Sequence, residues 1–70
     1  MSFWQRQQVK AAEKFLKWQY EKSGGAPPDE AELERQAAAV VDKARQIAKR
    51  TGRNVFEIVK DLIRDLKNRS

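Results

Sequence analysis

The sequence predicts an all-α fold, a small antiparallel three-helix bundle with helices at about residues 3–22, 29–51 and 54–68. In three separate stretches, apolar residues recur at steps of three and four, the spacing of one helix face. All three glycines and both prolines lie in two short segments between these stretches. Short connections favour antiparallel neighbours, so the helices are expected to fold back on one another.

The chain has 70 residues, enough for one domain, which we take as residues 1–70. It has no cysteine for a disulfide, so stability must come from helix packing or from self-association. The longest apolar run, residues 37–41, is too short to span a membrane. The first residues lack the apolar stretch of a secretory signal, so a cytoplasmic location is expected.

The first predicted helix has an aromatic side and a basic side. At about 100° per residue, the aromatic side gathers Trp4, Ala11, Ala12, Phe15, Leu16 and Trp18, with Val9 at its edge. The basic side gathers Arg6, Lys10, Lys14 and Lys17, with Glu13 and Glu21 among them. The simplest interpretation is a buried aromatic side and a solvated basic side. A basic amphipathic helix can also meet a membrane surface or an acidic partner.

Residues 23–28 read Ser-Gly-Gly-Ala-Pro-Pro and predict a loop, because proline cannot continue a helix. Asp29 and Glu32 then fit a capping box at the start of the second helix. Acidic residues cluster in its first turns and basic residues near its end, which the helix macrodipole favours. The apolar face of this helix carries Leu33, Ala37, Val40, Ala44, Ile47 and Ala48.

Residues 51–54, Thr-Gly-Arg-Asn, predict the turn into the third helix. Gly52 suits the left-handed conformation that ends a helix, and Asn54 suits an N-cap with Glu57 at the position that completes a capping box. Phe56 and Ile63 widen the apolar arc of this helix. We therefore expect a homodimer edge that uses these two residues, with Tyr20 as a further candidate.

The predicted core comprises Trp4, Phe15, Trp18, Leu33, Val40, Ala44, Ile47, Val55, Ile58, Val59, Leu62 and Leu66. The composition argues against an enzyme, since histidine and cysteine are absent and with them the usual bases, nucleophiles and soft metal ligands. A row of carboxylates on one helix, at Glu57, Asp61 and Asp65, cannot surround a calcium ion. No cofactor or metal is expected.

Ala48, Gly52 and Ile58 follow one another at steps of four and six residues. With these residues, the segment from Ala44 to Leu62 resembles the helix-turn-helix of DNA-binding repressors. The resemblance implies that the third helix enters a major groove. It would place near bases or phosphates the residues Arg53, Asn54, Glu57 and Lys60.

The segment departs from that pattern at Thr51 and Arg53, where apolar residues are usual, and at Asp61, where an aliphatic residue is usual. The alternative is an ordinary αα-hairpin closed by Gly52 and Asn54.

The net charge of +5 is unevenly distributed. Residues 1–28 carry five basic and two acidic side chains, a net charge of +3. Residues 29–41 carry one basic and four acidic side chains, a net charge of −3. Residues 42–70 carry nine basic and four acidic side chains, a net charge of +5. A basic excess suits an anionic partner, either nucleic acid or an acidic protein. The candidate binding residues are Arg6, Lys10, Lys14, Lys17, Lys49, Arg50, Arg53, Asn54 and Lys60.

Together these patterns predict a small non-enzymatic basic helical binding module, and nucleic acid is the anionic partner they favour. The alternative is a protein-interaction or self-assembling helical domain whose charge serves solubility. Capping boxes ahead of both later helices also fit a designed sequence, so natural and designed origin both stay open.

Overall fold

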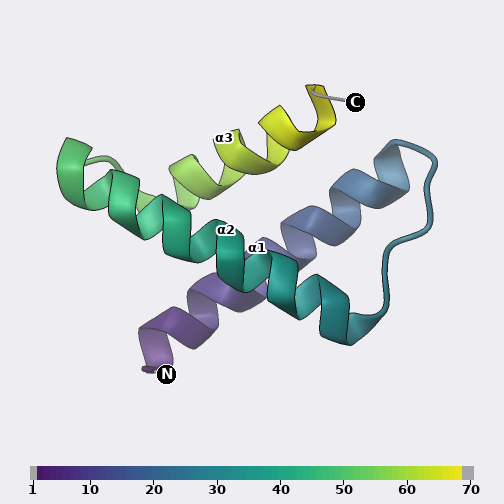
Figure 1. Ribbon diagram of the computed structural model, residues 1–70, viewed down its shortest axis with the longest axis horizontal. Helices are drawn as coiled ribbons and strands as arrows, with labels where there is room; N and C mark the ends of the chain where they lie inside the picture. Colours follow the sequence, from purple (N-terminus) through teal and green to yellow (C-terminus); the bar gives the residue numbers. More distant parts are fainter. Residues whose placement is uncertain (1, 69–70) are drawn as a thin grey trace.

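The computed structural model describes residues 2–68, with side chains as far as residue 65, and it confirms the all-α three-helix fold. The helices are α1 (Phe3–Lys22), α2 (Glu30–Thr51) and α3 (Val55–Asn68). α2 runs back across α1, and α3 turns back again beside α1, so that each helix contacts both others (Figure 1). These bounds agree with the predicted ranges to within one residue at each end. Within residues 2–68, no helix is long and apolar enough to cross a membrane.

Side-chain caps explain where α1 and α2 begin. The Ser2 hydroxyl accepts a hydrogen bond from the Gln5 N–H, and the Gln5 side chain accepts one from the Ser2 N–H, a capping box that the sequence analysis missed. At α2, Asp29 Oδ1 accepts from the Glu32 N–H at 2.9 Å, as predicted. The Glu32 carboxylate lies 2.9 Å from the Arg35 guanidinium instead of closing the box. A surface pair at this spacing contributes a few tenths of a kcal/mol, roughly.

The turn between α2 and α3 has the predicted left-handed glycine and the predicted Asn54 cap. The predicted capping box does not form, because Asn54 Oδ1 accepts from the Phe56 N–H and no hydrogen bond joins Asn54 to Glu57 within the described residues. Gly52 has φ 75°, in the left-handed region, and its N–H donates to the Ala48 carbonyl at 2.8 Å. The Thr51 hydroxyl donates to the Ile47 carbonyl at 2.8 Å, and Asn54 Oδ1 accepts from the N–H of the second residue of α3 at 2.8 Å. The turn is therefore held by hydrogen bonds between residues close in sequence.

Gly52→Ala is expected to lower the free energy of unfolding by about 1–2 kcal/mol, because an L side chain is strained at this φ. Crowding does not contribute, since an added Cβ would meet nothing within 4 Å. Gly25→Ala is the matched control: Gly25 has no positive φ, and its added Cβ would lie 4.0 Å from the Tyr20 carbonyl oxygen. Urea unfolding followed by circular dichroism measures both variants. An equal loss in the two would show that the left-handed conformation is not what Gly52 provides.

The buried core draws on all three helices. Its members are Val9, Ala12, Leu16, Leu33, Ala37, Val41, Ala44, Ile58, Val59 and Ile63. Four residues of the predicted core are among them, namely Leu33, Ala44, Ile58 and Val59. Five more are half-buried and pack against it, namely Phe15, Val40, Ile47, Val55 and Leu62. Leu66 lies outside the described side chains.

The prediction that both tryptophans are buried was wrong. Trp4 is 74% exposed and Trp18 is 49% exposed, and α1 instead buries Val9, Ala12 and Leu16. The apolar side of α1 is broad enough to pack in two orientations. The core that α2 offers contains the fully buried alanines 37 and 44, and small residues let helices approach closely. The narrow row of smaller side chains on α1, Val9, Ala12 and Leu16, fits against this surface, whereas two bulky indoles do not.

The assignment of Ile63 to an exposed dimer edge was also wrong. Ile63 is 0% exposed, whereas Phe56 is 45% exposed. Because α3 packs against both α1 and α2, its wide apolar arc is used within one chain. Tyr20 is half-buried, and its hydroxyl donates to Gln36 Oε1 on α2 at 3.0 Å, so it too has a partner within the chain. A homodimer through Phe56 and Ile63 is therefore not available in this fold.

Candidate functional site

Four cations line the solvent-facing side of α1, and we call them the basic stripe: Arg6, Lys10, Lys14 and Lys17. All four are exposed, because the helix turns Val9, Ala12 and Leu16 toward the core and its other side outward. Within the described side chains, none of the four forms an ion pair with a carboxylate. Their charge is therefore not cancelled by a direct ion pair.

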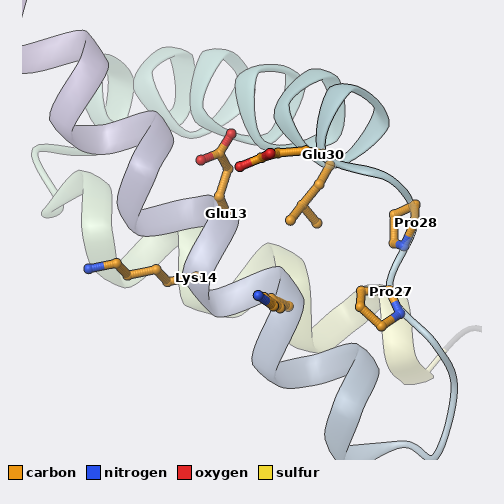
Figure 2. Close-up of a pocket in the computed structure, with 7 residues that line it drawn as sticks. Glu13, Lys14, Pro27, Pro28 and Glu30 are labelled. Atoms are coloured by element: carbon orange, nitrogen blue, oxygen red, sulfur yellow. The ribbon is translucent and has the colours of Figure 1, made fainter.

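On the side that faces α2, carboxylates lie among these cations. One hollow between α1, the loop and the start of α2 is lined by Glu13, Lys14, Lys17, Pro27, Pro28, Glu30 and Leu33 (Figure 2). The carboxylates of Glu13 and Glu30 point toward one another across it (Figure 2). A second hollow brings Arg6 and Lys10 beside Glu13, Glu30 and Glu34. The acidic start of α2 thus lies along one border of the basic stripe and offsets its charge there, which makes these hollows poor anion sites.

The opposite border of α1 faces α3 and carries two aromatic rings, the exposed Trp18 and the half-buried Phe15, with cations beside them. The Trp18 and Phe15 rings meet edge to face, with centroids 5.7 Å apart and an interplanar angle of 63°. Lys22 Nζ lies 4.7 Å from the Trp18 ring centroid. Lys60 Nζ, which comes from α3, lies 5.9 Å from the Phe15 ring centroid. We call these four side chains the aromatic–cation ladder.

Among the side chains that the structure describes, the two lysines of the ladder contact ring quadrupoles and form no ion pair with a carboxylate. Such contacts hold a cation in place without cancelling its charge. Phe56, one helical turn before Lys60, is a further large exposed ring on α3. This edge therefore combines positive charge with apolar ring surface, a pairing that the two hollows beside α2 lack.

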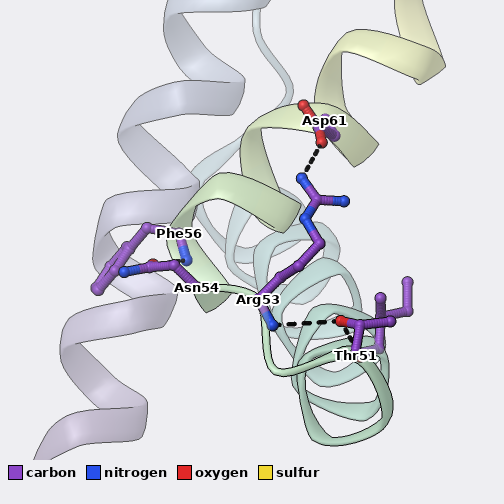
Figure 3. A network of polar contacts seen from close by, with 6 residues as sticks. Thr51, Arg53, Asn54, Phe56 and Asp61 are labelled. Atoms are coloured by element: carbon purple, nitrogen blue, oxygen red, sulfur yellow. Dashed lines mark hydrogen bonds and ion pairs between the residues drawn. The ribbon is translucent and has the colours of Figure 1, made fainter.

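At the turn, the polar candidates are already engaged by neighbouring groups (Figure 3). Arg53 donates to Asp61 Oδ2 at 2.8 Å. This hydrogen bond and the charge of Asp61 raise the pKa of Arg53 above its usual value. Asn54 Oδ1 accepts the Phe56 N–H as a helix cap. These contacts are those of a closed αα-hairpin, and they occupy two residues that the helix-turn-helix resemblance assigns to DNA.

The nine predicted binding residues therefore do not form one continuous surface. The basic stripe borders Glu30 in the first turn of α2, whereas Lys49 and Arg50 lie exposed in its last turn. At 1.5 Å per residue, these two ends of α2 are roughly 28 Å apart. Lys60 belongs to neither group, because it lies in the ladder between α1 and α3.

Sequence reasoning missed Lys22 and placed Phe15 and Trp18 in the core. One signal was available: Phe15, Trp18 and Lys22 follow at steps of three and four, so they share one helix border. The contribution of Lys60 had no such signal, since it comes from another helix. Comparisons with protein-family models, with curated proteins and with solved structures find no significant match to this chain.

Proposed function

We propose that this chain is a small non-enzymatic binding module that holds nucleic acid by its phosphate backbone. The observation that carries this proposal is the basic stripe, whose four cations are exposed and form no direct ion pair within the described side chains. Each lysine or arginine that neutralises a phosphate releases condensed counterions, which supplies most of the affinity of sequence-independent binding. The net charge of +5 supports attraction to such a partner at longer range.

The proposal assigns the contact to α1 rather than to the turn. Arg53 and Asn54 have partners within the chain, and the outward face of α3 mixes exposed acidic and basic residues. Backbone contacts position a protein on nucleic acid without reading the sequence. We therefore propose binding that is general with respect to base sequence.

Lys10→Gln combined with Lys14→Gln is expected to weaken binding to every oligonucleotide. On a single strand, the loss of two phosphate contacts should also flatten the slope of log Kd against log salt by roughly 1.4 units. Fluorescence anisotropy with labelled oligonucleotides, measured between about 50 and 200 mM salt, gives both quantities. Circular dichroism checks that each variant is folded.

Lys49→Gln combined with Arg50→Gln is the matched control. It also removes two units of positive charge, but in the last turn of α2, whereas the basic stripe on α1 borders the first turn of α2. Screening limits the effect of a remote charge, because the Debye length is about 8 Å at physiological ionic strength. The control should therefore bind nearly as well as the parent. If the control loses as much affinity as the α1 variant, the binding surface is not the basic stripe.

A protein-interaction or self-assembling domain is the second candidate, and the exposed rings of Phe3, Trp4, Trp18 and Phe56 favour it. Large exposed apolar residues that gather on a surface mark contact sites for other proteins. The same titration separates the two candidates. If the parent binds neither single strand nor duplex at low salt, the nucleic-acid proposal fails and the interaction domain is retained.

A further inference from the structure

We infer that the ligand is single-stranded nucleic acid and that an unpaired base stacks on Trp18; this inference rests on the proposed function. The observation behind it is the aromatic–cation ladder. It lies along the border of α1 away from the hollows where carboxylates offset the basic stripe. Proteins that hold single strands combine a positively charged path for the backbone with aromatic rings on which bases stack.

Trp18 is suited to be that stacking ring. It is 49% exposed, so about half of its surface is in contact with solvent, and a stacked base would use the part of the ring that the Lys22 ammonium does not cover. The Phe15 ring supports it from within α1 at 5.7 Å between centroids, and Lys22 lies over it at 4.7 Å. Contacts with two neighbours limit how freely the indole can turn, so less freedom is lost when a base stacks on it.

The ladder also places positive charge on both sides of the ring pair. Lys22 adjoins Trp18 on α1, and Lys60 adjoins Phe15 from α3. Lys22 lies 4.7 Å from the Trp18 centroid and Lys60 lies 5.9 Å from the centroid of the adjoining Phe15 ring, so both ammonium groups are available to the backbone of a strand whose base stacks on Trp18. Lys14 of the basic stripe stands four residues before Trp18, so the two are neighbours on the surface of α1 and the strand can continue from the ladder onto the stripe.

A duplex cannot use this arrangement, because its bases are paired and already stacked on one another. Duplex binding would depend on the basic stripe alone. The affinity difference between single strand and duplex should therefore disappear when Trp18 is removed. Stacking of one base on one aromatic ring changes affinity by about tenfold, which sets the size of the expected effect.

The test is anisotropy with a labelled oligothymidylate and with its duplex with oligodeoxyadenylate, on the full chain. Trp18→Ala should weaken single-strand binding about tenfold and change duplex binding little. Trp4→Ala is the matched control, because Trp4 is the more exposed indole of α1 and lies outside the ladder. It should leave both affinities close to those of the parent.

A second measurement keeps the test valid if Trp18→Ala does not fold. In a Trp4→Phe variant, Trp18 is the only tryptophan, so its fluorescence should be quenched by the oligothymidylate and much less by the duplex. Absence of quenching on binding overturns the inference. So does an equal loss of single-strand and duplex affinity in a folded Trp18→Ala variant.

The binding measurements distinguish a failure of this inference from a failure of the proposed function. If the parent binds single strand and duplex equally well and Trp18→Ala changes neither, the inference is wrong while backbone binding through the basic stripe stands. If the parent binds neither probe at low salt, both fail. The exposed rings would then belong to a protein interface.

Discussion

Ile63→Ala is expected to lower the free energy of unfolding by about 2–5 kcal/mol, the cost of removing buried methylene groups and leaving a cavity. Ile63 is 0% exposed and belongs to the core cluster formed by all three helices. At 0.05–0.15 kcal/mol per residue, a chain of this length has a total stability of roughly 4–10 kcal/mol. The variant should therefore lose a large share of its free energy of unfolding.

Phe56→Ala on the same helix is the control for this experiment. It removes a larger side chain, but Phe56 is 45% exposed, so nearly half of its surface is in water already. We expect a loss below about 1 kcal/mol, typical of surface substitutions with some packing. Urea unfolding followed by circular dichroism measures both. If Ile63→Ala proves the milder change, α3 does not face the core as described, and Ile63 is again available to a second copy.

Ala37→Leu is expected to destabilise the protein by about 1–3 kcal/mol, because it inserts methylene groups into a filled interior. Ala37 is 0% exposed in the middle of α2, which contacts both other helices. Three extra carbon atoms at this position must displace α1 or α3, or force side chains away from their preferred rotamers. Leucine and alanine have similar helix propensities, so the cost comes from packing and not from the helix itself.

Ala39→Leu gives a close control, since it makes the same substitution two residues away on the exposed side of α2. It should change the free energy of unfolding by no more than about 0.5 kcal/mol. Thermal and urea unfolding of the two variants measure the difference. Equal stabilities would mean that α2 does not present Ala37 to its neighbours, and the packing of the three helices would have to be revised.

The ends of the helices could be predicted because their causes are local. The Asp29 cap joins residues three apart, the Asn54 cap joins residues two apart, and the Gly52 conformation depends on that residue's own φ. Such hydrogen bonds form between groups that the chain already holds close together. For the same reason, the outward position of the basic stripe followed from helical spacing alone.

The sequence could not determine which side of α1 is buried. Its broad apolar side allowed a stripe centred on the indoles or one centred on Ala12, and both satisfy helical periodicity. The choice depends on the shape of the surface that α2 and α3 offer together. Similarly, Ile63 was expected at an exposed edge because the apolar arc of α3 is wider than one partner helix can cover. In the structure α3 packs against two helices, which cover the arc at Ile63.

The features of the candidate site also fall into two groups, those with local causes and those that depend on contacts between helices. By itself the sequence determined the helices, their caps and the row of cations on α1, since each depends on residues within one or two turns. Only the tertiary structure brought Lys60 over Phe15, placed the acidic start of α2 along the basic stripe and paired Arg53 with Asp61. These contacts join residues that are distant in sequence or lie on different elements. They form only when whole helix surfaces pack against one another, and a local sequence pattern does not predict how those surfaces fit in shape and burial.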